Sequence, residues 1–570
     1  MGSELGVTAD SKADIDLSPV TIWWAVWACV WTIAVVLGMA YLIVHRNMPT
    51  LRIRGLGLSL SAIVLLHLYW APVQFATMVG PLLPGDCQYW MMGTLLPCGV
   101  ALFHASNARF LHVAKLQRKY AQYGERLFLS PTPEEKPKGL IARFHRLSYS
   151  TKMLTIVGIG MFLQIFLTIL MWLISRKWHS SWGIPGTEVH GTIMEQKMAQ
   201  GAGWEWWPGV AWQLAWSWIV APIVLWKSRN IHDTHGWRVQ TIGCAIANLH
   251  ATPMWLIGLY VPAMAPVNTV WVPPQWICLS IMFIEIFTVF LPCWEVMRHQ
   301  SLRQETLDSI ARWELKVKST GSEAKSLNSE STMVDSRISG WKSANGSVKT
   351  ENSYRDSIMT MSALEHVLER NPAPLQEFSA LREFSGENIV FLTSLAEWKN
   401  SLPATLRDRT LPRDSNSRDV IRDHFNRALH IYAEFISVRH AEFPVNISSQ
   451  ELRKLESIFE HPTRLIYGEE RECVDPTSPF DKFTFDLPSP THSDSSEKPM
   501  KSSVKSSLTD AIKDRVQYWG DIPADFDASI FDAAEASIKY LVLTNTWPKF
   551  IKDRRDSVGS FDTLDVSMEV

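Results

Sequence analysis

Seven long apolar runs in the first half of the chain limit what it can fold into. Each run has about 20 residues or more, the length that an α-helix needs to cross the apolar core of a bilayer. Lipid offers no hydrogen-bonding partners, so the backbone in such runs has to be helical. The sequence therefore predicts a bundle of seven transmembrane helices within residues 20–297, with spans at 20–44, 54–79, 89–111, 152–175, 206–226, 238–261 and 274–297.

The lysine and arginine residues between the runs predict which side of the membrane each loop faces. If the N-terminal tail, residues 1–19, lies outside, the three inner loops hold 15 of these residues and the outer segments hold four. Inner loops of membrane proteins carry such an excess of positive charge. We therefore expect an integral protein of the plasma membrane, in contact with the lipid bilayer, with an extracellular N-terminus and a cytoplasmic C-terminal half.

The remaining composition argues against several other classes of protein. The formal net charge of −2 indicates no surface suited to nucleic acid. The seven cysteines show no spacing, with each other or with histidine, that is typical of a zinc site. We expect no metal, no cofactor and no nucleic-acid partner.

The C-terminal half alternates polar segments with helical patterning. Residues 298–357 predict a charged helix followed by a linker rich in Ser, Asn and Gly, a composition typical of disorder. Apolar residues at helical spacing then predict an all-helical domain over 358–555, with a disordered insertion at about 475–507. A tail at 556–570 follows. The overall fold class is therefore predicted to be all-α.

One segment of this domain, E-F-S-G-E-N-I-V-F at 383–391, places polar residues at the start of an otherwise apolar helix. Ser385 has the N-cap position, Glu387 lies in the first turn near the positive end of the helix dipole, and Asn388 follows at N3. Helix capping accounts for these residues without any binding role. The segment alone leaves both interpretations open.

A second segment covers residues 428–451 and contains a helical apolar stripe. The chain breaks at Pro444, and Ser448-x-x-Glu451 has the pattern of a capping box that begins another helix. Asn446 is predicted to lie in the connection between the two helices.

A third segment, residues 531–550, has a further apolar stripe that includes Leu541. Asn545, Thr546 and Pro548 are predicted to end this helix. In this segment polar residues follow the apolar stripe, whereas in the first segment they precede it. In both segments the stripe itself is suited to packing in a core.

In this order, the three segments resemble the regulator of G-protein signalling (RGS) domain. This all-helical module accelerates GTP hydrolysis by the α subunit (Gα) of heterotrimeric G proteins. The matching patterns are Ser-x-Glu-Asn with a later Glu-Trp-Lys, then Ile-Tyr-x-x-Phe-Ile with Val-Asn-Ile, and last Phe-Asp-x-Ala with Trp-Pro-Lys-Phe. Together they span about 170 residues.

The resemblance implies that Gα, in its GTP or transition-state form, is the partner. It implies a Gα-binding surface formed by Ser385, Glu387, Asn388, Asn446, Leu541, Asn545 and Lys549. Asn446 matches the family residue that contacts the glutamine orienting the attacking water. Such a domain supplies no arginine finger and holds the switch segments of Gα in their transition-state arrangement. This chain is therefore not expected to be an enzyme or to have catalytic residues of its own.

The third segment departs from the family pattern. Where the family has Asp, Thr or Ser and, further on, Arg, this chain has Asn545 and Lys549. An ammonium group lacks the planar fork of donors of a guanidinium group. We expect the two changes to alter affinity or the choice of Gα, and to leave the fold unchanged.

Seven spans followed by an RGS domain resemble the receptor-like RGS proteins of fungi and plants, and the long linker and insertion are similar to the fungal kind. His67, His250 and Glu285 fall near the middle of their predicted spans, where an ionisable side chain usually faces the bundle interior. Two interpretations remain open for them. They form a cluster that binds a small-molecule signal or senses protons, or they make separate hydrogen bonds between helices.

Two other functions remain as alternatives. A transporter with a regulatory domain would suit ionisable residues within the membrane, but the seven runs show no inverted repeat. A scaffold whose RGS domain binds Gα or another partner, without accelerating GTP hydrolysis, is favoured by the changes at Asn545 and Lys549.

Overall fold

The structure is a computed structural model in which every secondary-structure element of the described residues is helical, apart from one isolated bridge between Ser175 and Ile184. The all-α prediction is thus confirmed for this part of the chain. The predicted insertion and most of the predicted linker lie outside it. The described residues are 4, 6–8, 11–122, 149–179, 182–320, 358–403, 415–468, 517–523 and 525–555.

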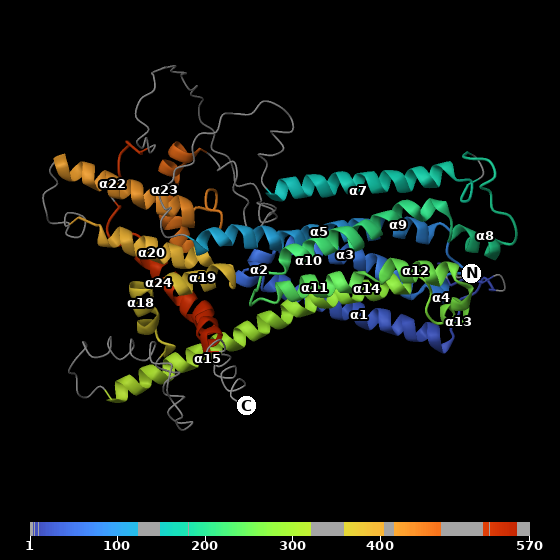
Figure 1. Ribbon diagram of the computed structural model, residues 1–570, viewed down its shortest axis with the longest axis horizontal. Helices are drawn as coiled ribbons and strands as arrows, with labels where there is room; N and C mark the ends of the chain where they lie inside the picture. Colours follow the sequence, from blue (N-terminus) through green and yellow to red (C-terminus); the bar gives the residue numbers. More distant parts are fainter. Residues whose placement is uncertain are drawn as a thin grey trace, which may run out of the picture.

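Six helices of the described residues are long and apolar enough to cross a membrane, and they coincide with six of the predicted spans. Several of them lie side by side in a bundle (Figure 1). They are α1 (Pro19–Val44), α3 (Leu56–Gln74), α7 (Tyr149–Ile174), the helix formed by α9 (Trp207–Leu214), η2 (Ala215–Val220) and α10 (Ala221–Ser228), the pair α11 (Trp237–Asn248) and α12 (Ala251–Tyr260), and the helix that begins with α14 (Gln275–Glu285) and η4 (Ile286–Phe290).

The other predicted span, 89–111, lies within α5 (Cys87–Ala121), a helix of 35 residues. This helix packs against α3 and α7 in the bundle. Its buried side chains include Gln88, His104 and Asn107, which make it more polar than the six spans described above. Its crossing of the membrane stays a prediction.

Short helices close the two ends of the bundle. At the end near the N-terminus lie α4 (Ala76–Val79), α8 (Ile193–Gln200) and α13 (Ala265–Asn268), with the turns η1 (Trp204–Trp206) and η3 (Pro262–Met264). At the opposite end, α2 (Pro49–Arg54) connects α1 to α3. We call this opposite end, made by α2, by residues 110–122 of α5 and by the loop 229–236, the inner end, because the positive residues predict that it faces the cytoplasm.

The last span does not stop at the inner end. The helix continues from η4 into α15 (Leu291–Thr320), which runs well beyond the bundle in Figure 1. The charged helix predicted after residue 298 is therefore a continuation of the membrane span. The last span and the helices that pack on α15 are therefore connected through one continuous helix.

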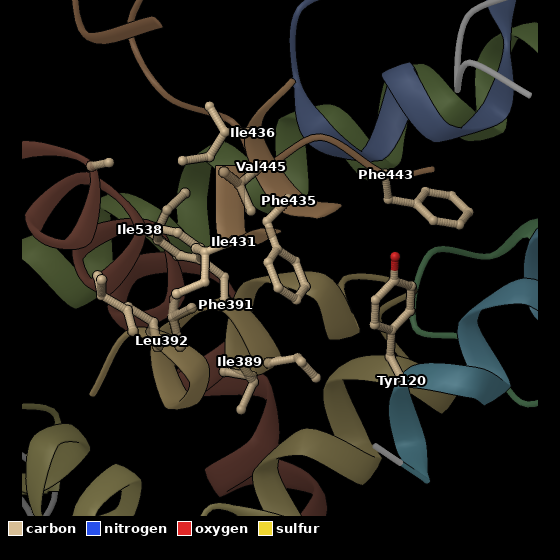
Figure 2. Packing of buried hydrophobic residues seen from close by; sticks show 14 of the residues in the cluster. Tyr120, Ile389, Phe391, Leu392, Ile431, Phe435, Ile436, Phe443, Val445 and Ile538 are labelled. Atoms are coloured by element: carbon tan, nitrogen blue, oxygen red, sulfur yellow. The ribbon is translucent and has the colours of Figure 1, made fainter. Parts of the chain in front are cut away.

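The remaining helices gather at the inner end. They are α18 (Met361–Arg370), α19 (Ala373–Leu381), α20 (Gly386–Asn400), α22 (Ser415–Ile431) with η5 (Tyr432–Ile436), α23 (Ser449–Tyr467), and α24 (Asp532–Leu541) with η7 (Val542–Thr546). Figure 2 shows apolar side chains of α20, of the segment around η5, and of α24 pointing toward one another. The three patterned segments of the sequence thus meet in one core.

Two kinds of contact hold these segments together. Aromatic rings pack across them, with 5.5 Å between the ring centroids of Trp398 and Phe531 and 6.1 Å between those of Phe391 and Phe435. Lys399, at the end of α20, forms ion pairs with Asp532 and Glu535 at the start of α24. The Glu-Trp-Lys pattern therefore serves the core and the junction between these two helices.

The predicted end of the last helix is wrong. After η7, the chain stays helical over residues 547–555, so Asn545, Thr546 and Pro548 lie within a helix. A proline has no backbone N–H to donate, and the wider π turn just before it breaks the regular hydrogen-bond ladder at the same place. The helix can therefore pass through Pro548 and position Lys549 on its continuation.

Candidate functional site

Ser385 has the predicted N-cap position of α20, but its hydroxyl does not cap the helix. Ser385 Oγ lies 3.0 Å from the hydroxyl of Ser379, which lies 2.8 Å from the Ser385 carbonyl and donates to it. The backbone N–H of Gly386, the first of the helix, donates to Gln117 Oε1 in α5 at 3.0 Å. The expected side-chain cap is wrong because a residue of the membrane bundle satisfies the helix start.

Glu387 is buried against the same glutamine. Its side chain is 8% exposed, and Oε2 accepts a hydrogen bond of 2.9 Å from Gln117 Nε2. Burial raises the pKa of Glu387 to about 7, while the hydrogen bond from Gln117 and the charge of Arg52 in α2 oppose the rise. The carboxyl group is therefore covered by the bundle in this structure.

Asn388, the next residue, is also buried, with 6% of its surface exposed. Its Oδ1 has no hydrogen-bond partner within the described residues. A buried acceptor without a partner typically costs about 1–3 kcal/mol. Glu387 and Asn388, two of the residues expected to touch Gα, are thus both shielded from solvent, Glu387 with a partner in α5 and Asn388 with an unsatisfied Oδ1.

Phe384 anchors the start of α20 in the bundle. It is the one non-glycine residue with positive φ in the described chain, at 49°, and it is 1% exposed. Its ring centroid lies 6.0 Å from that of Phe110 in α5 and 6.5 Å from that of Trp237 in α11. A left-handed backbone costs a residue with a side chain roughly 1–2 kcal/mol, which burial of the ring offsets.

Asn446 lies in the connection between η5 and α23, as predicted, and it is exposed. The predicted capping box is confirmed, because Ser448 Oγ accepts from Glu451 N at 3.2 Å and Glu451 Oε2 accepts from Ser448 N at 2.9 Å. The same connection carries Phe443, whose ring centroid lies 6.1 Å from that of Tyr120 in α5 (Figure 2). This segment therefore touches the bundle and leaves the Asn446 side chain accessible.

The third segment brings Leu541, Asn545 and Lys549 to the same region. Leu541 packs at the margin of the core, and Asn545 is half-buried with an Oδ1 that has no partner within the described residues. Lys549 Nζ lies 2.7 Å from Glu383 Oε2, two residues before Ser385. The pair links the last helix to the start of α20, so Lys549 has a carboxylate partner within the chain.

The loop between α10 and α11 also meets Glu383. Asp233 caps α11 by accepting from the backbone N–H of Trp237 at 2.7 Å and from that of His235 at 3.2 Å. In the loop so shaped, the Thr234 hydroxyl donates to Glu383 Oε1, and His235 Nε2 donates to the Glu383 carbonyl at 2.9 Å. Burial, followed by the charge of Lys549, lowers the pKa of His235 to about 3, so this contact is made by a neutral imidazole.

Four residues that matter at this site were missed from the sequence: Gln117, Tyr120, Thr234 and His235. Each is a polar or aromatic residue in an inner segment that the sequence marks only by its positive charge. The sequence D-T-H-G at 233–236 predicts that Asp233 caps the helix that follows. No nearby residue predicts that Thr234 and His235 contact Glu383. Glu383 is the first residue of the segment 383–391, but the RGS patterns quoted above do not include it.

Inside the bundle, the structure brings two of the three predicted polar residues together. His67 Nδ1 lies 2.7 Å from Glu285 Oε1, and His67 Nε2 lies 3.0 Å from the Thr32 hydroxyl. The other oxygen of Glu285 accepts from Trp31 Nε1. This group connects α1, α3 and α14 through a fully buried carboxyl group.

His250 is not part of that group. Its Nε2 faces the Ser280 hydroxyl at 3.4 Å, at the break between α11 and α12. The three residues thus form a hydrogen-bonded pair plus a separate histidine contact, an arrangement that lies between the two interpretations left open by the sequence. Within the described residues, no group of three or more His, Cys, Asp or Glu side chains is placed to hold a metal ion.

Comparison of the chain with protein families, with curated proteins and with solved structures finds no match. The identity of the site therefore has to be argued from its own residues and geometry.

Proposed function

We propose that this protein is a membrane-anchored regulator of heterotrimeric G-protein signalling, whose C-terminal helices bind Gα and accelerate its GTP hydrolysis. One observation carries the proposal. The three patterned segments, far apart in the sequence, pack on a single core, and two of them meet at Tyr120, which contacts Phe443 and the start of α20. Residues matched to a Gα-binding surface thus come from segments that are neighbours in space.

In the proposed mechanism, the chemistry belongs to Gα. Its own arginine and glutamine act on GTP and water, and the C-terminal helices hold its switch segments in place. Glu387 and Asn388 would bind the switch segments from the start of α20. Asn446, the exposed amide in the connection after η5, would contact the glutamine that orients water. An amide suits that role because it donates and accepts hydrogen bonds without adding a charge.

The membrane half would anchor this activity at the plasma membrane, with α5 as the seventh span and the inner end in the cytoplasm. The pair formed by His67 and Glu285 is a candidate for sensing a small molecule or a proton, since an ionisable pair within a membrane bundle often marks a functional position. Which external signal acts there is a separate question from the Gα partnership.

One observation favours a second function, a scaffold that binds Gα without accelerating hydrolysis. Lys549 is paired with Glu383 at 2.7 Å, so the cation at the third contact is not available in this arrangement. Binding through the other contacts, without full stabilisation of the switch segments, would then give a complex with unchanged hydrolysis.

Single-turnover GTP hydrolysis by purified Gα, with and without the full chain in lipid nanodiscs, tests the proposal. We expect faster hydrolysis with the native chain and a loss of most of the acceleration in Asn446→Ala. An exposed side chain in a connection contributes within about 0.5 kcal/mol to stability, so the melting temperature of this variant should be nearly unchanged. Binding without acceleration would favour the scaffold, and an unaffected Asn446→Ala would refute the assigned role.

A further inference from the structure

The membrane bundle and the C-terminal helices share one hydrophobic core. This core contains residues of the inner end, with Phe110, Val113 and Ile231 among them, and Trp237 at the start of α11, together with the cores of α19, α20 and η5. Phe384 inserts its ring between the two halves. Large aromatic rings contribute much of the energy of packed interfaces. Because rings from both halves are buried here, the two halves form a packed interface.

The start of α20 is fitted to α5 at close range. A Cβ atom added to Gly386 would lie 2.7 Å from Tyr120 Cβ, so only glycine permits this approach. Gln117, itself fully buried, donates to Glu387 and accepts from Gly386 N. A third hydrogen bond runs from Gln376 Nε2 to the Tyr120 carbonyl at 2.6 Å. The helix end that carries two predicted Gα contacts therefore has α5 as its partner.

Around this centre, two further contacts extend the interface. Lys119 Nζ lies 3.5 Å from Glu442 Oε2, next to the connection that carries Asn446. On the other side, Thr234 and His235 bind Arg382 and Glu383. The inner end thus meets the first two patterned segments directly, and reaches Lys549 of the third through Glu383.

We propose that this arrangement is a closed, autoinhibited state, in which the inner end of the bundle occupies part of the surface that Gα would bind. The inference rests on the function proposed above and concerns its regulation. Glu387 and Asn388 are 8% and 6% exposed, and Gln117 of α5 binds Glu387, so neither residue can touch a second protein in this arrangement. Gα and the inner end therefore compete for the same residues. Exposed Asn446 remains available for a first encounter.

The test compares two single substitutions on α5 that change the charge equally. Gln117→Glu replaces the amide that donates to Glu387 with a second carboxyl group, and at a pH above about 7 the two carboxylates repel in a buried contact. Arg118→Gln, on the exposed side of the same turn, is the matched control. Neither position belongs to the predicted Gα surface. Should Gln117→Glu fail to fold, Gln117→Ala removes both hydrogen bonds without adding charge.

Binding of Gα loaded with GDP and aluminium fluoride is measured for each full chain in nanodiscs. Opening a mostly closed population raises apparent affinity in proportion to the open fraction. We expect Gln117→Glu to bind about tenfold more tightly than the native chain, equivalent to about 1.4 kcal/mol, and Arg118→Gln to bind like the native chain. Equal, measurable binding by all three chains would overturn the autoinhibition and leave the proposed function intact.

A second readout reports the closed state without relying on function. A carbodiimide joins a lysine to a carboxylate only when they touch, and Lys119 is accessible, with 63% of its side chain exposed. We expect a Lys119–Glu442 cross-link in the native chain, less of it in Gln117→Glu, and less when Gα is added. Absence of the cross-link from the native chain would overturn the closed state. A cross-link that responds to Gln117→Glu, with no Gα binding by any chain, would overturn the proposed function and with it the competition.

Discussion

Glu387 is a buried carboxyl group in the contact between the membrane bundle and the C-terminal helices, so this contact depends on the protonation of one side chain. A neutral amide, Gln117, faces its carboxyl group, and Arg52 is the charged group that acts on it from α2. The position of Glu387 in the first turn of a helix was predictable from S-G-E-N. Its burial was not, because Gln117 lies 270 residues away and carries no local signal of this contact.

The stability of the chain should depend on pH through this residue. The pKa of Glu387 is about 7 in the folded chain against 4.5 ordinarily, so the folded state binds more protons between these values. Stability therefore falls as the pH rises through this window, and the full cost, on the order of 3 kcal/mol, is present above about pH 7.

Glu387→Gln removes the titrating group and keeps an acceptor for Gln117. Its melting temperature in nanodiscs should be close to that of the native chain near pH 5 and clearly higher at pH 8. A difference between the two chains that stays constant over this range would contradict the burial of an ionisable Glu387. Glu397→Gln, an exposed glutamate on the same helix, is the control that should show no such trend.

At the scale of elements, helix starts were easier to predict than helix ends and contacts. The capping box of α23 is complete in the sequence, because both of its residues lie within one turn. The end proposed at Pro548 was wrong, because a π turn before the proline lets the helix continue, and sequence periodicity does not reveal such a turn. Local patterns therefore predicted the capping box of α23, but neither the contact from Gln117 at the start of α20 nor the helix that continues past Pro548.

Ser448→Ala should lower stability by about 1 kcal/mol, because the N-cap hydroxyl accepts a hydrogen bond from Glu451 N that alanine does not replace. Thermal unfolding of the full chain measures the change. Ser449→Ala, one residue later and equally exposed, should change stability by less than about 0.5 kcal/mol. Equal effects of both substitutions would show that the capping box contributes nothing beyond a surface serine.

For the whole molecule, composition and charge predicted more than any motif did. Six apolar spans follow directly from hydropathy, and the 15 inner cations predict the orientation of the bundle. The packing of the C-terminal helices on the inner end could not be predicted. It depends on Phe384 meeting Trp237 and on Tyr120 meeting Phe443, and each of these residues is equally suited to a core of its own domain.

The predicted orientation can be tested on intact cells. An epitope inserted after Lys12, which is exposed, should be accessible to antibody without permeabilisation. An epitope in the tail at residue 565 should be accessible only after permeabilisation. Insertion nearer the start would be a poorer choice, because Glu4 and Val7 are buried at 1% exposure each. The reverse staining pattern would place the C-terminal helices outside the cell and exclude a cytosolic Gα as their partner.

The unbroken helix that leaves the bundle as α15 has a mechanical consequence. Its 30 residues extend about 45 Å at 1.5 Å per residue, and it packs on η7, with Ile310 against the shared core. If α15 tilts as a rigid rod about its start, a tilt of about 5° displaces Ile310, about 30 Å along the helix, by about 2.5 Å. A small tilt of the last span would thus shift the contact between α15 and η7 by more than the length of a carbon–carbon bond.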